Sequence, residues 1–333
     1  MSKDLQDECK GVETNGCISR QKSEIVAPRT SSAEGTGKVH VREVTFDDLF
    51  RQKFIPLDSR KKVGNYVIGK IIGEGTFSKV REARHVTNSE KRAVKVLPKK
   101  TILKRPDVRR RFMREVKSLR KITHRNIVHI HEVMETAGNY YIVMDLLKGD
   151  NFKEYLNKRK RLVEDEAKHF MYQVVDAVHY MHSRGIVHRD MKPENIILNG
   201  DLIKIVDFGL CACIKEGDIM TTQCGSPAYA APEIFSKEPY TKLVDVWSIG
   251  VILFLAVTGC MPFNIAGKSS TQVYTMFLKG FEIPNTLQLS EACETLISQM
   301  LTVNPDYRIL TSDILLHPWF KKNTGRSQPM TTI

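Results

Sequence analysis

The chain has 333 residues, which is enough for two lobes and two tails, and its 41% hydrophobic and 27% charged residues are typical of a soluble globular protein. The formal net charge of +13 favours acidic partners, such as nucleotides, phosphorylated proteins or anionic surfaces, but it names none of them. Seven scattered cysteines form no CxxC pair, which argues against a zinc site or a disulfide scaffold.

The N-terminal sequence MSKDLQDECK lacks the apolar region of a secretory signal, and Ser2 excludes N-myristoylation. The longest apolar stretch, VWSIGVILFLAV from Val246, is too short to span a bilayer and predicts a buried helix. Because no secretory signal is present, we expect reduced cysteines and a cytoplasmic location, with the nucleus as the alternative.

Residues 1–60 are predicted to be a mostly disordered tail, because residues 1 to about 40 are polar and lack helical or strand periodicity. Within this tail, the segment FDDLFRQKFIPL from Phe46 could be a small docking helix or a linker. Residues 321–333, KKNTGRSQPMTTI, are again tail-like.

Residues 66–97 alternate in polarity and are rich in β-branched residues, which predicts antiparallel strands in YVIGKIIG, SKVREARH and KRAVKVL. A basic helix is expected from Val108 to Lys121, and the segments IVHIHEVMET and YYIVMDLL predict two further strands. We therefore predict a small β-rich lobe over residues 61–147.

Long helices dominate the chain from about Asn151, in NFKEYLNKRK, EDEAKHFMYQVVDAVHYMHSRG, VDVWSIGVILFLAVTG and SEACETLISQML. Residues 148–320 are predicted to form a larger helical lobe. The expected fold class is therefore α+β, with two lobes.

A glycine-rich turn, GEGTFSKV, follows the first predicted strand. Gly73 and Gly75 would let backbone amides approach a phosphate closely. Ser78 replaces the third glycine of the usual GxGxxG pattern, and a strand rather than a helix follows, which argues against a dinucleotide-binding fold. Alone, the turn is weak evidence, because most such turns are ordinary hairpins.

Lys95 lies between valines in the predicted strand AVKV, where an ammonium group is costly to bury unless it is paired. Glu115 lies twenty residues later in the predicted basic helix and could pair with Lys95 and hold it against a phosphate. The alternative is that Lys95 reaches solvent and Glu115 is an ordinary surface residue.

The segment HRDMKPENIILNGDLIKIVDFG, His188–Gly209, carries the strongest signal. It places Asp190, Asn195 and Asp207 around two short apolar runs, IIL and IKIV, which are joined by the polar turn NGD. Together with GEGTFSKV, AVKV, APE, DVWSIG and HPWF, in this order, it resembles the protein kinase family over about residues 66–320. The resemblance implies a two-lobed kinase fold and phosphoryl transfer from ATP to protein substrates.

The resemblance also implies the roles of the polar residues in this segment. Asp190 would accept or orient the proton of the substrate hydroxyl, and Lys192 would place a positive charge beside the transferring phosphate. Asn195 and Asp207 would hold Mg²⁺ against the ATP phosphates, because hard oxygen ligands suit this ion.

The implied nucleotide site lies in the small lobe and in the hinge that follows it. Lys95 would hold the phosphates with Glu115 as its helix partner, and Met144 would guard the pocket behind the adenine. The backbone of the hinge, from Asp145 to Leu147, would bind the adenine. The residues implied for nucleotide binding are Gly73, Gly75, Val80, Ala93, Lys95, Met144, Asp145 and Leu147.

Two motifs resemble those of serine/threonine-specific kinases. KPEN follows HRD, and GSPAYAAPE resembles a substrate-binding segment that places Ser226 near Asp190 and Lys192. Glu194 could face a basic residue of a peptide substrate. Many basophilic relatives carry a glutamate after the hinge, but Asn151 stands at that position here, which puts a preference for arginine at the minus-three position in doubt.

The segment DFGLCACIKEGDIMTTQCGSP most resembles the calmodulin-dependent kinase group, near the AMP-activated kinase relatives, and TTQCGSPAYAAPE is especially similar to the hormonally up-regulated Neu-associated kinases. The resemblance implies that an upstream kinase activates the protein by phosphorylating Thr222, whose phosphate Arg189 would bind. The alternative is that Thr221 and Thr222 are ordinary loop residues. Because only a short tail follows HPWF, regulation is expected from this loop, from the N-terminal tail or from partners.

Further interpretations concern charged residues elsewhere in the chain. Glu233 and Arg308 are expected to form a structural ion pair. The run from Lys99 to Lys121 contains eleven lysines and arginines and could dock an acidic partner, although a solvated helix face is the simpler interpretation. It carries no interleaved aromatic set or zinc spacing, so a nucleic-acid partner is not supported.

Two other classes of protein stay open on the sequence. A pseudokinase scaffold would use the fold only for binding, but such proteins usually lack the equivalents of Lys95, Asp190 or Asp207, all of which are present here. A basic nucleic-acid-binding module is the weaker alternative, and salt-dependent retention on RNA or DNA would reveal it.

Overall fold

The computed structural model describes residues 62–321 with the exception of 75–77 and 216. The predicted N-terminal tail, its FDDLF segment, Gly75 and the C-terminal tail beyond Lys321 lie outside the described residues. Within the described part, none of the helices combines the length and the apolar character that crossing a membrane would require.

A six-stranded antiparallel sheet forms the first part of the described chain, with the strand order β1-β2-β3-β4-β6-β5. The three strands predicted over residues 66–97 and the two that follow the basic helix are confirmed, and a short β1 that was not predicted precedes them. The strands are β1 (Lys62–Val63), β2 (Tyr66–Glu74), β3 (Lys79–His85), β4 (Lys91–Pro98), β5 (Ile130–Glu135) and β6 (Asn139–Asp145).

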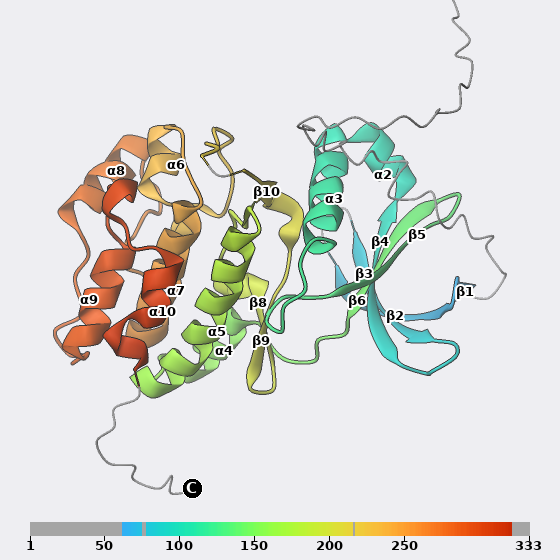
Figure 1. Ribbon diagram of the computed structural model, residues 1–333, viewed down its shortest axis with the longest axis horizontal. Helices are drawn as coiled ribbons and strands as arrows, with labels where there is room; N and C mark the ends of the chain where they lie inside the picture. The colour runs from blue at the N-terminus through green and yellow to red at the C-terminus, as the bar shows by residue number, and fades with distance from the viewer. Residues whose placement is uncertain (1–61, 75–77, 216, 322–333) are drawn as a thin grey trace, which may run out of the picture. The chain divides into compact units, whose positions relative to one another are not determined.

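Two helices, α2 (Lys99–Lys104) and α3 (Pro106–Leu119), connect β4 to β5 and lie beside the sheet (Figure 1). Pro106 stands at the start of α3, where its missing amide hydrogen costs nothing, so the helix begins two residues before the predicted start. The buried side of α3 carries Phe112, Glu115 and Val116, and its basic residues are mostly exposed. The sequence pattern did not predict α2.

The second part of the described chain is built from seven α-helices and two small strand pairs. The helices are α4 (Phe152–Arg159), α5 (Glu164–Ser183), α6 (Pro232–Ser236), α7 (Leu243–Thr258), α8 (Ser270–Lys279), α9 (Glu291–Met300) and α10 (Thr311–Leu316). The strand pairs are β7 (Ile186–Val187) with β10 (Ala212–Cys213), and β8 (Ile196–Asn199) with β9 (Leu202–Ile205). The last pair consists of the two apolar runs that the turn NGD joins.

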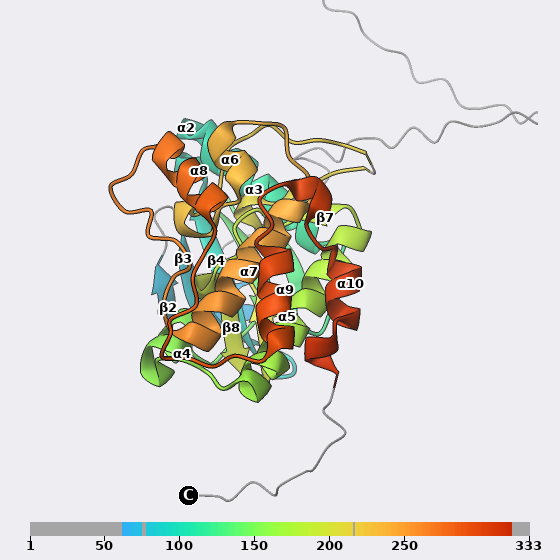
Figure 2. The same cartoon turned by 90° about the vertical axis from the view of Figure 1, so that its left-hand side faces the viewer.

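Helix α7 is the centre of the helical part, and nearly all of its residues are buried, as its unbroken apolar sequence predicts. It packs against α5 on one side and α9 on the other (Figure 1), and α10 lies beside α5 (Figure 2). Gly250 permits the close approach of α9, because a Cβ atom at this position would lie 2.9 Å from the Cβ of Met300. The helical part therefore has one central, tightly packed element.

The expected ion pair between Glu233 and Arg308 is present and buried. The Arg308 guanidinium donates from Nη1 to Oε1 of Glu233 at 2.7 Å and from Nη2 to Oε2 at 2.9 Å. The same guanidinium also donates to the carbonyl oxygens of Thr302, Val303 and Leu243. This geometry joins the start of α6 to the segment that follows α9 and to the first residue of α7.

Replacing Glu233 with glutamine should lower the free energy of unfolding by about 3–5 kcal/mol, because the buried Arg308 would lose its counter-charge. Urea denaturation followed by circular dichroism measures this change. The control is Asp165→Asn, which removes the exposed partner of Lys168 and should change stability by less than about 0.5 kcal/mol. Equal effects of the two substitutions would contradict the structural role of Glu233.

Candidate active site

Three polar side chains form a hydrogen-bonded triangle at the segment between β7 and β8. Lys192 Nζ donates to Asp190 Oδ2 at 2.8 Å and to Ser226 Oγ at 2.9 Å. Ser226 Oγ donates to Asp190 Oδ1 at 2.8 Å. Asn195 binds the same aspartate: its Nδ2 donates to the carbonyl oxygen of Asp190 at 2.8 Å and to Asp190 Oδ2 at 3.2 Å. The structure therefore brings together the residues that the HRD and GSP motifs predicted.

The backbone of this segment is held by a carboxylate that sequence analysis did not single out. Asp245 of α7 is completely buried, and its side chain accepts the amides of His188 at 2.9 Å and Arg189 at 2.8 Å. It also accepts a hydrogen bond from His182 Nε2 of α5 at 2.9 Å. The available signal was an aspartate within an otherwise apolar run, since a buried carboxylate must be satisfied.

Asp245 also supports an uncommon backbone conformation. Arg189 has a φ of 65°, in the left-handed region that non-glycine residues rarely adopt. Burial alone would raise the pKa of Asp245, but the hydrogen bond from His182, the charges of His182 and His188 and the His188 amide hold it below its usual value. The carboxylate is therefore the stable form that keeps the segment in place.

The predicted pairing of Lys95 with Glu115 is present. Lys95 Nζ in β4 lies 2.8 Å from Oε1 and 2.6 Å from Oε2 of Glu115 in α3. Burial opposes the charged form of Lys95, but the Glu115 and Asp207 carboxylates outweigh it and raise the pKa of the ammonium. The lysine therefore stays charged between these two carboxylates.

Asp207 lies between β9 and the short 3₁₀ helix Phe208–Leu210, against which α3 packs. Its φ of 62° places it in the left-handed region, and its Oδ1 accepts only a long hydrogen bond, 3.4 Å, from the Gly209 amide. The side-chain nitrogen of Asn195 donates to the carbonyl oxygen of Asp190, so the side-chain oxygen is the atom of Asn195 that can bind a cation. Oxygen atoms of these two residues form a donor set that suits Mg²⁺.

Among the described residues no group of three or more His, Cys, Asp or Glu side chains could hold a metal ion. A magnesium ion at Asn195 and Asp207 would therefore need further oxygen ligands from water or phosphate, which is how this ion is commonly bound.

The residues predicted for nucleotide binding lie on adjacent strands. Gly73 of β2 pairs with Val80 of β3, and Val80 pairs in turn with Lys95 of β4, so the three form one row across the sheet. Ala93 of β4 pairs with Met144 of β6 in a second row. Half-buried Leu147 lies just beyond β6.

Asp145 is bound within a polar cluster that the sequence did not indicate. Its side chain contacts His131 Nε2 at 2.9 Å, Lys204 Nζ at 3.2 Å and the His129 amide at 3.2 Å. Burial raises the pKa of Asp145, but these three partners together lower it below its usual value. Because the Asp145 amide donates to the His129 carbonyl, an adenine contact at Asp145 would have to use its own carbonyl.

The structure links Arg189 to Thr222 through one tyrosine. Arg189 Nη1 donates to the hydroxyl of Tyr240 at 3.1 Å, and that hydroxyl donates to the carbonyl of Thr222. The Thr222 residue itself is exposed. Gly225 lies nearby with a φ of 106°, and a Cβ atom there would lie 2.6 Å from the Arg189 carbonyl, so only glycine lets this loop approach so closely.

Two residues considered for peptide recognition have partners within the protein. Asn151 caps α4, because its side chain accepts the Glu154 amide at 2.9 Å in a capping box. Glu194 Oε1 accepts a hydrogen bond from Lys153 at 2.7 Å, whereas its buried Oε2 has no partner among the described residues. Glu194 is therefore the better placed of the two for a basic ligand.

The sheet, the helical part and the Asp190 and Lys95 clusters together define a protein kinase. Residues 66–320 match the protein kinase domain, and the chain belongs to the protein kinase family. The two-lobed kinase fold predicted from the sequence is confirmed.

Three relatives place the chain more closely. It is 41% identical over 261 residues to the SNF1-related protein kinase catalytic subunit alpha KIN12 of Arabidopsis thaliana, covering 78% of this chain and 52% of that protein. It is 38% identical over 282 residues to the human hormonally up-regulated neu tumor-associated kinase, covering 83% and 40%. It is 40% identical over 273 residues to the CBL-interacting serine/threonine-protein kinase 5 of Arabidopsis thaliana, covering 80% and 60%.

The chain thus spans about half the length of these relatives. They confirm the predicted resemblance to the AMP-activated and calmodulin-dependent type of serine/threonine kinase.

Replacing Asp245 with asparagine should lower the free energy of unfolding by about 3 kcal/mol, because two buried amides and His182 would lose a charged acceptor. Urea denaturation at several pH values measures the loss. Since the folded-state pKa lies below the usual 3.8, the stabilisation is complete above pH 3.8 and is lost as the pH falls through the folded value. A stability difference that does not shrink in acid would contradict this account.

Proposed function

We propose that the protein transfers the γ-phosphoryl group of ATP to serine or threonine hydroxyls of protein substrates. The triangle of Asp190, Lys192 and Ser226 is the observation that supports this most, because it sets an acceptor for a hydroxyl proton beside a positive charge. The pair of Lys95 and Glu115 supplies a second, fixed positive charge for the nucleotide phosphates.

In this mechanism, Asp190 orients the attacking hydroxyl and accepts its proton, and Ser226 keeps the carboxylate turned toward the substrate. Lys192 stabilises negative charge on the transferring group, and Lys95 holds the phosphates of the donor. Asp190, Lys192 and Ser226 are already connected by hydrogen bonds, so these three groups need little reorganisation at the moment of transfer.

The oxygens of Asn195 and Asp207 would hold Mg²⁺, which when bound neutralises phosphate charge. The loose contact of Asp207 with Gly209 leaves its carboxylate able to turn toward a ligand. The position of Asp207 depends in turn on α3, which packs against the 3₁₀ helix that follows it.

Substrate selection is proposed to involve Glu194. Its Oε2 has no hydrogen-bond partner in the part of the chain that the structure describes, and this favours a basic residue in the peptide. Lys153, which donates to Oε1, would have to share the carboxylate with that residue or move away. Asn151, held in its capping box, offers no charge for an arginine at the minus-three position.

We propose a cytoplasmic location, with the nucleus as the alternative.

An upstream kinase is proposed to activate the protein at Thr222. The Tyr240 hydroxyl connects the Thr222 carbonyl to the Arg189 guanidinium, so a phosphate on Thr222 would be close to this guanidinium. In the structure, the guanidinium donates to the Leu210 carbonyl and to Tyr240. The new ion pair would join the loop to the segment that carries Asp190 and so order both.

Replacing Asp207 with asparagine should lower kcat for transfer of radiolabelled phosphate from Mg-ATP to a serine/threonine peptide array by at least about 100-fold, because it removes a charged magnesium ligand. The matched control is Asp201→Asn in the exposed turn between β8 and β9, which should retain full activity. A wild-type protein without transfer, even when phosphorylated at Thr222, would favour the pseudokinase scaffold instead.

Protein that carries phosphothreonine at position 222, installed during translation, should phosphorylate its best array peptide about 10-fold faster or more than unphosphorylated protein. Phosphothreonine at position 221 serves as the control and should give no comparable gain. Equal stimulation from both positions would refute a specific role for Thr222.

A further inference from the structure

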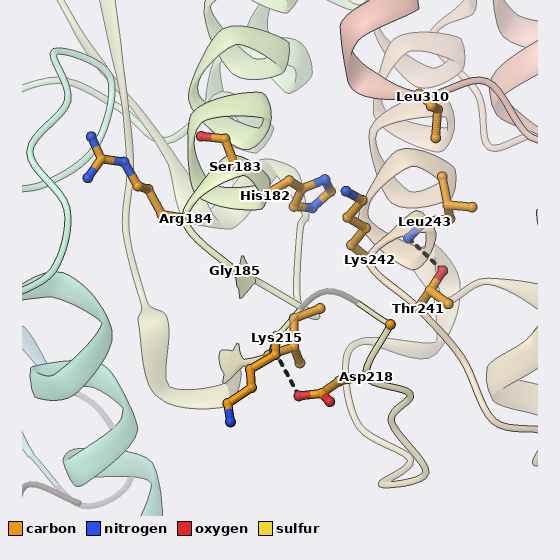
Figure 3. A pocket seen from close by; sticks show the side chains of 12 residues that line it. His182, Ser183, Arg184, Gly185, Lys215, Asp218, Thr241, Lys242, Leu243 and Leu310 are labelled. Carbon is orange, nitrogen blue, oxygen red and sulfur yellow. Dashed lines mark hydrogen bonds between the residues drawn. The ribbon is translucent and has the colours of Figure 1, made fainter. Parts of the chain in front are cut away.

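A cavity lies in the helical part of the molecule, apart from the residues assigned to phosphoryl transfer. Its volume is about 640 Å³, which falls in the range of small-ligand sites. Four segments build it: the end of α5 with the turn after it, the loop that follows β10, the residues that lead into α7, and Leu310 just before α10 (Figure 3). None of the residues proposed to act on ATP or on the substrate hydroxyl lines it.

The lining of this cavity is cationic. Arg184, Lys215 and Lys242 come from three of these segments, and Asp218 is the one acidic residue among the described lining residues. Among the described lining residues, three lysine and arginine side chains and one aspartate give a formal net charge of +2. Unlike charges attract strongly across a partly enclosed space, so such a lining favours an anion.

The cations of the lining are not neutralised within the described part of the chain. No salt bridge is formed there by Arg184, Lys215 or Lys242, and the Arg184 guanidinium lies over the Tyr180 ring instead, 5.2 Å from its centroid. The Asp218 carboxylate accepts the Lys215 amide at 2.8 Å and is thereby occupied with the backbone of its own loop. The positive charge is therefore available to a ligand.

The view in Figure 3 shows how these side chains lie. Lys242 extends toward His182, whereas Arg184 and Lys215 lie across the pocket from Leu310, with the Arg184 guanidinium directed away from Lys242. Long basic side chains can reorient around their aliphatic stems, so the three cations can approach a ligand from different sides.

The cavity also has an apolar wall. Ile214, Leu243 and Leu310 line it, and Leu310 remains 46% exposed, which leaves apolar surface for a ligand to cover. Gly185 allows Ile214 to approach closely. A Cβ atom at position 185 would lie 2.2 Å from the Ile214 carbonyl oxygen, so a residue with a side chain would not fit there. The wall is therefore part of the fold and not a loosely attached loop.

From this combination we propose that the cavity is a binding site for a phosphate monoester joined to an apolar group. A phosphate monoester carries about −1.5 to −2 charge near pH 7, which matches the lining charge, and its apolar group would cover Leu310 and Leu243. The same chemistry occurs in free phosphorylated metabolites and in phosphorylated side chains of proteins.

Occupation of the cavity would act on the loop that carries Thr222. Met220 and Tyr240 exchange backbone hydrogen bonds of 2.8 Å in both directions. The lining residues Lys215 and Asp218 precede this bridge, and Lys242 follows it. A ligand that draws these residues together would stabilise the bridge and the Tyr240 contact to Thr222, and would slow hydrogen exchange over residues 217–222.

The test uses phenyl phosphate as the probe and isothermal titration calorimetry as the measurement, with magnesium and a non-hydrolysable ATP analogue present to fill the nucleotide site. We expect a dissociation constant below about 1 mM for the full chain. Benzenesulfonate, phenol and inorganic phosphate should each bind at least about 10-fold more weakly, because each lacks part of the charge or the apolar group.

The double variant Lys215→Gln, Lys242→Gln should weaken phenyl phosphate binding at least about 10-fold and abolish the slowing of hydrogen exchange. Lys268→Gln, at another exposed lysine, is the matched control and should change neither. Equal affinities in wild type and double variant, or no binding to wild type, would overturn the proposal. The readout is binding, so it succeeds or fails independently of the proposed kinase activity.

Peptide libraries with phosphorylated and unphosphorylated threonine or tyrosine then distinguish the two sources. A phosphopeptide that binds about 10-fold more tightly than phenyl phosphate, and loses this in the double variant, assigns the site to a protein side chain. Phenyl phosphate binding that no phosphopeptide exceeds assigns it to a free metabolite.

Discussion

The buried carboxylate of Asp245 is the interaction on which the rest of the site depends. It stands on α7, the most deeply buried helix, and binds two consecutive amides of the segment that carries Asp190. A short segment without regular structure cannot hold a catalytic side chain by its own hydrogen bonds, because its backbone groups need partners elsewhere. Because α7 supplies these partners from the core, the position of Asp190 depends on the packing of the whole helical lobe.

The small lobe depends on a comparable contact. Lys95 and Glu115 join β4 to α3, and α3 in turn packs against the 3₁₀ helix that follows Asp207. A displacement of α3 would therefore separate the ion pair and disturb the proposed magnesium ligand together. The loop with Thr222 reaches the same region through Tyr240 and Arg189, so hydrogen bonds connect the elements proposed to bind the nucleotide and the metal with the proposed regulatory loop.

Much of the fold and of the candidate site could be predicted from local pattern. Alternating apolar residues predicted β2, β3 and β4, and the motif residues of the HRD segment came together around Asp190. Short or weakly periodic elements such as β1 and α2 escaped prediction. The polar cluster around Asp145 was not predicted either. Its partners His131 and Lys204 lie 14 and 59 residues away in the sequence, and no local pattern indicates that the three side chains meet.

By itself, the sequence determined the family and the chemical groups available, because ordered motifs over 255 residues specify which side chains stand where along the chain. Only the tertiary structure decided which partners those groups have. Lys95 could have reached solvent and Asp245 could have been an ordinary helix residue. Burial in a packed interior obliges charged groups to find specific partners, and those partners are set by contacts between distant segments. The cationic cavity behind the Thr222 loop arises in the same way, since its three cations are separated in sequence and meet only in the fold.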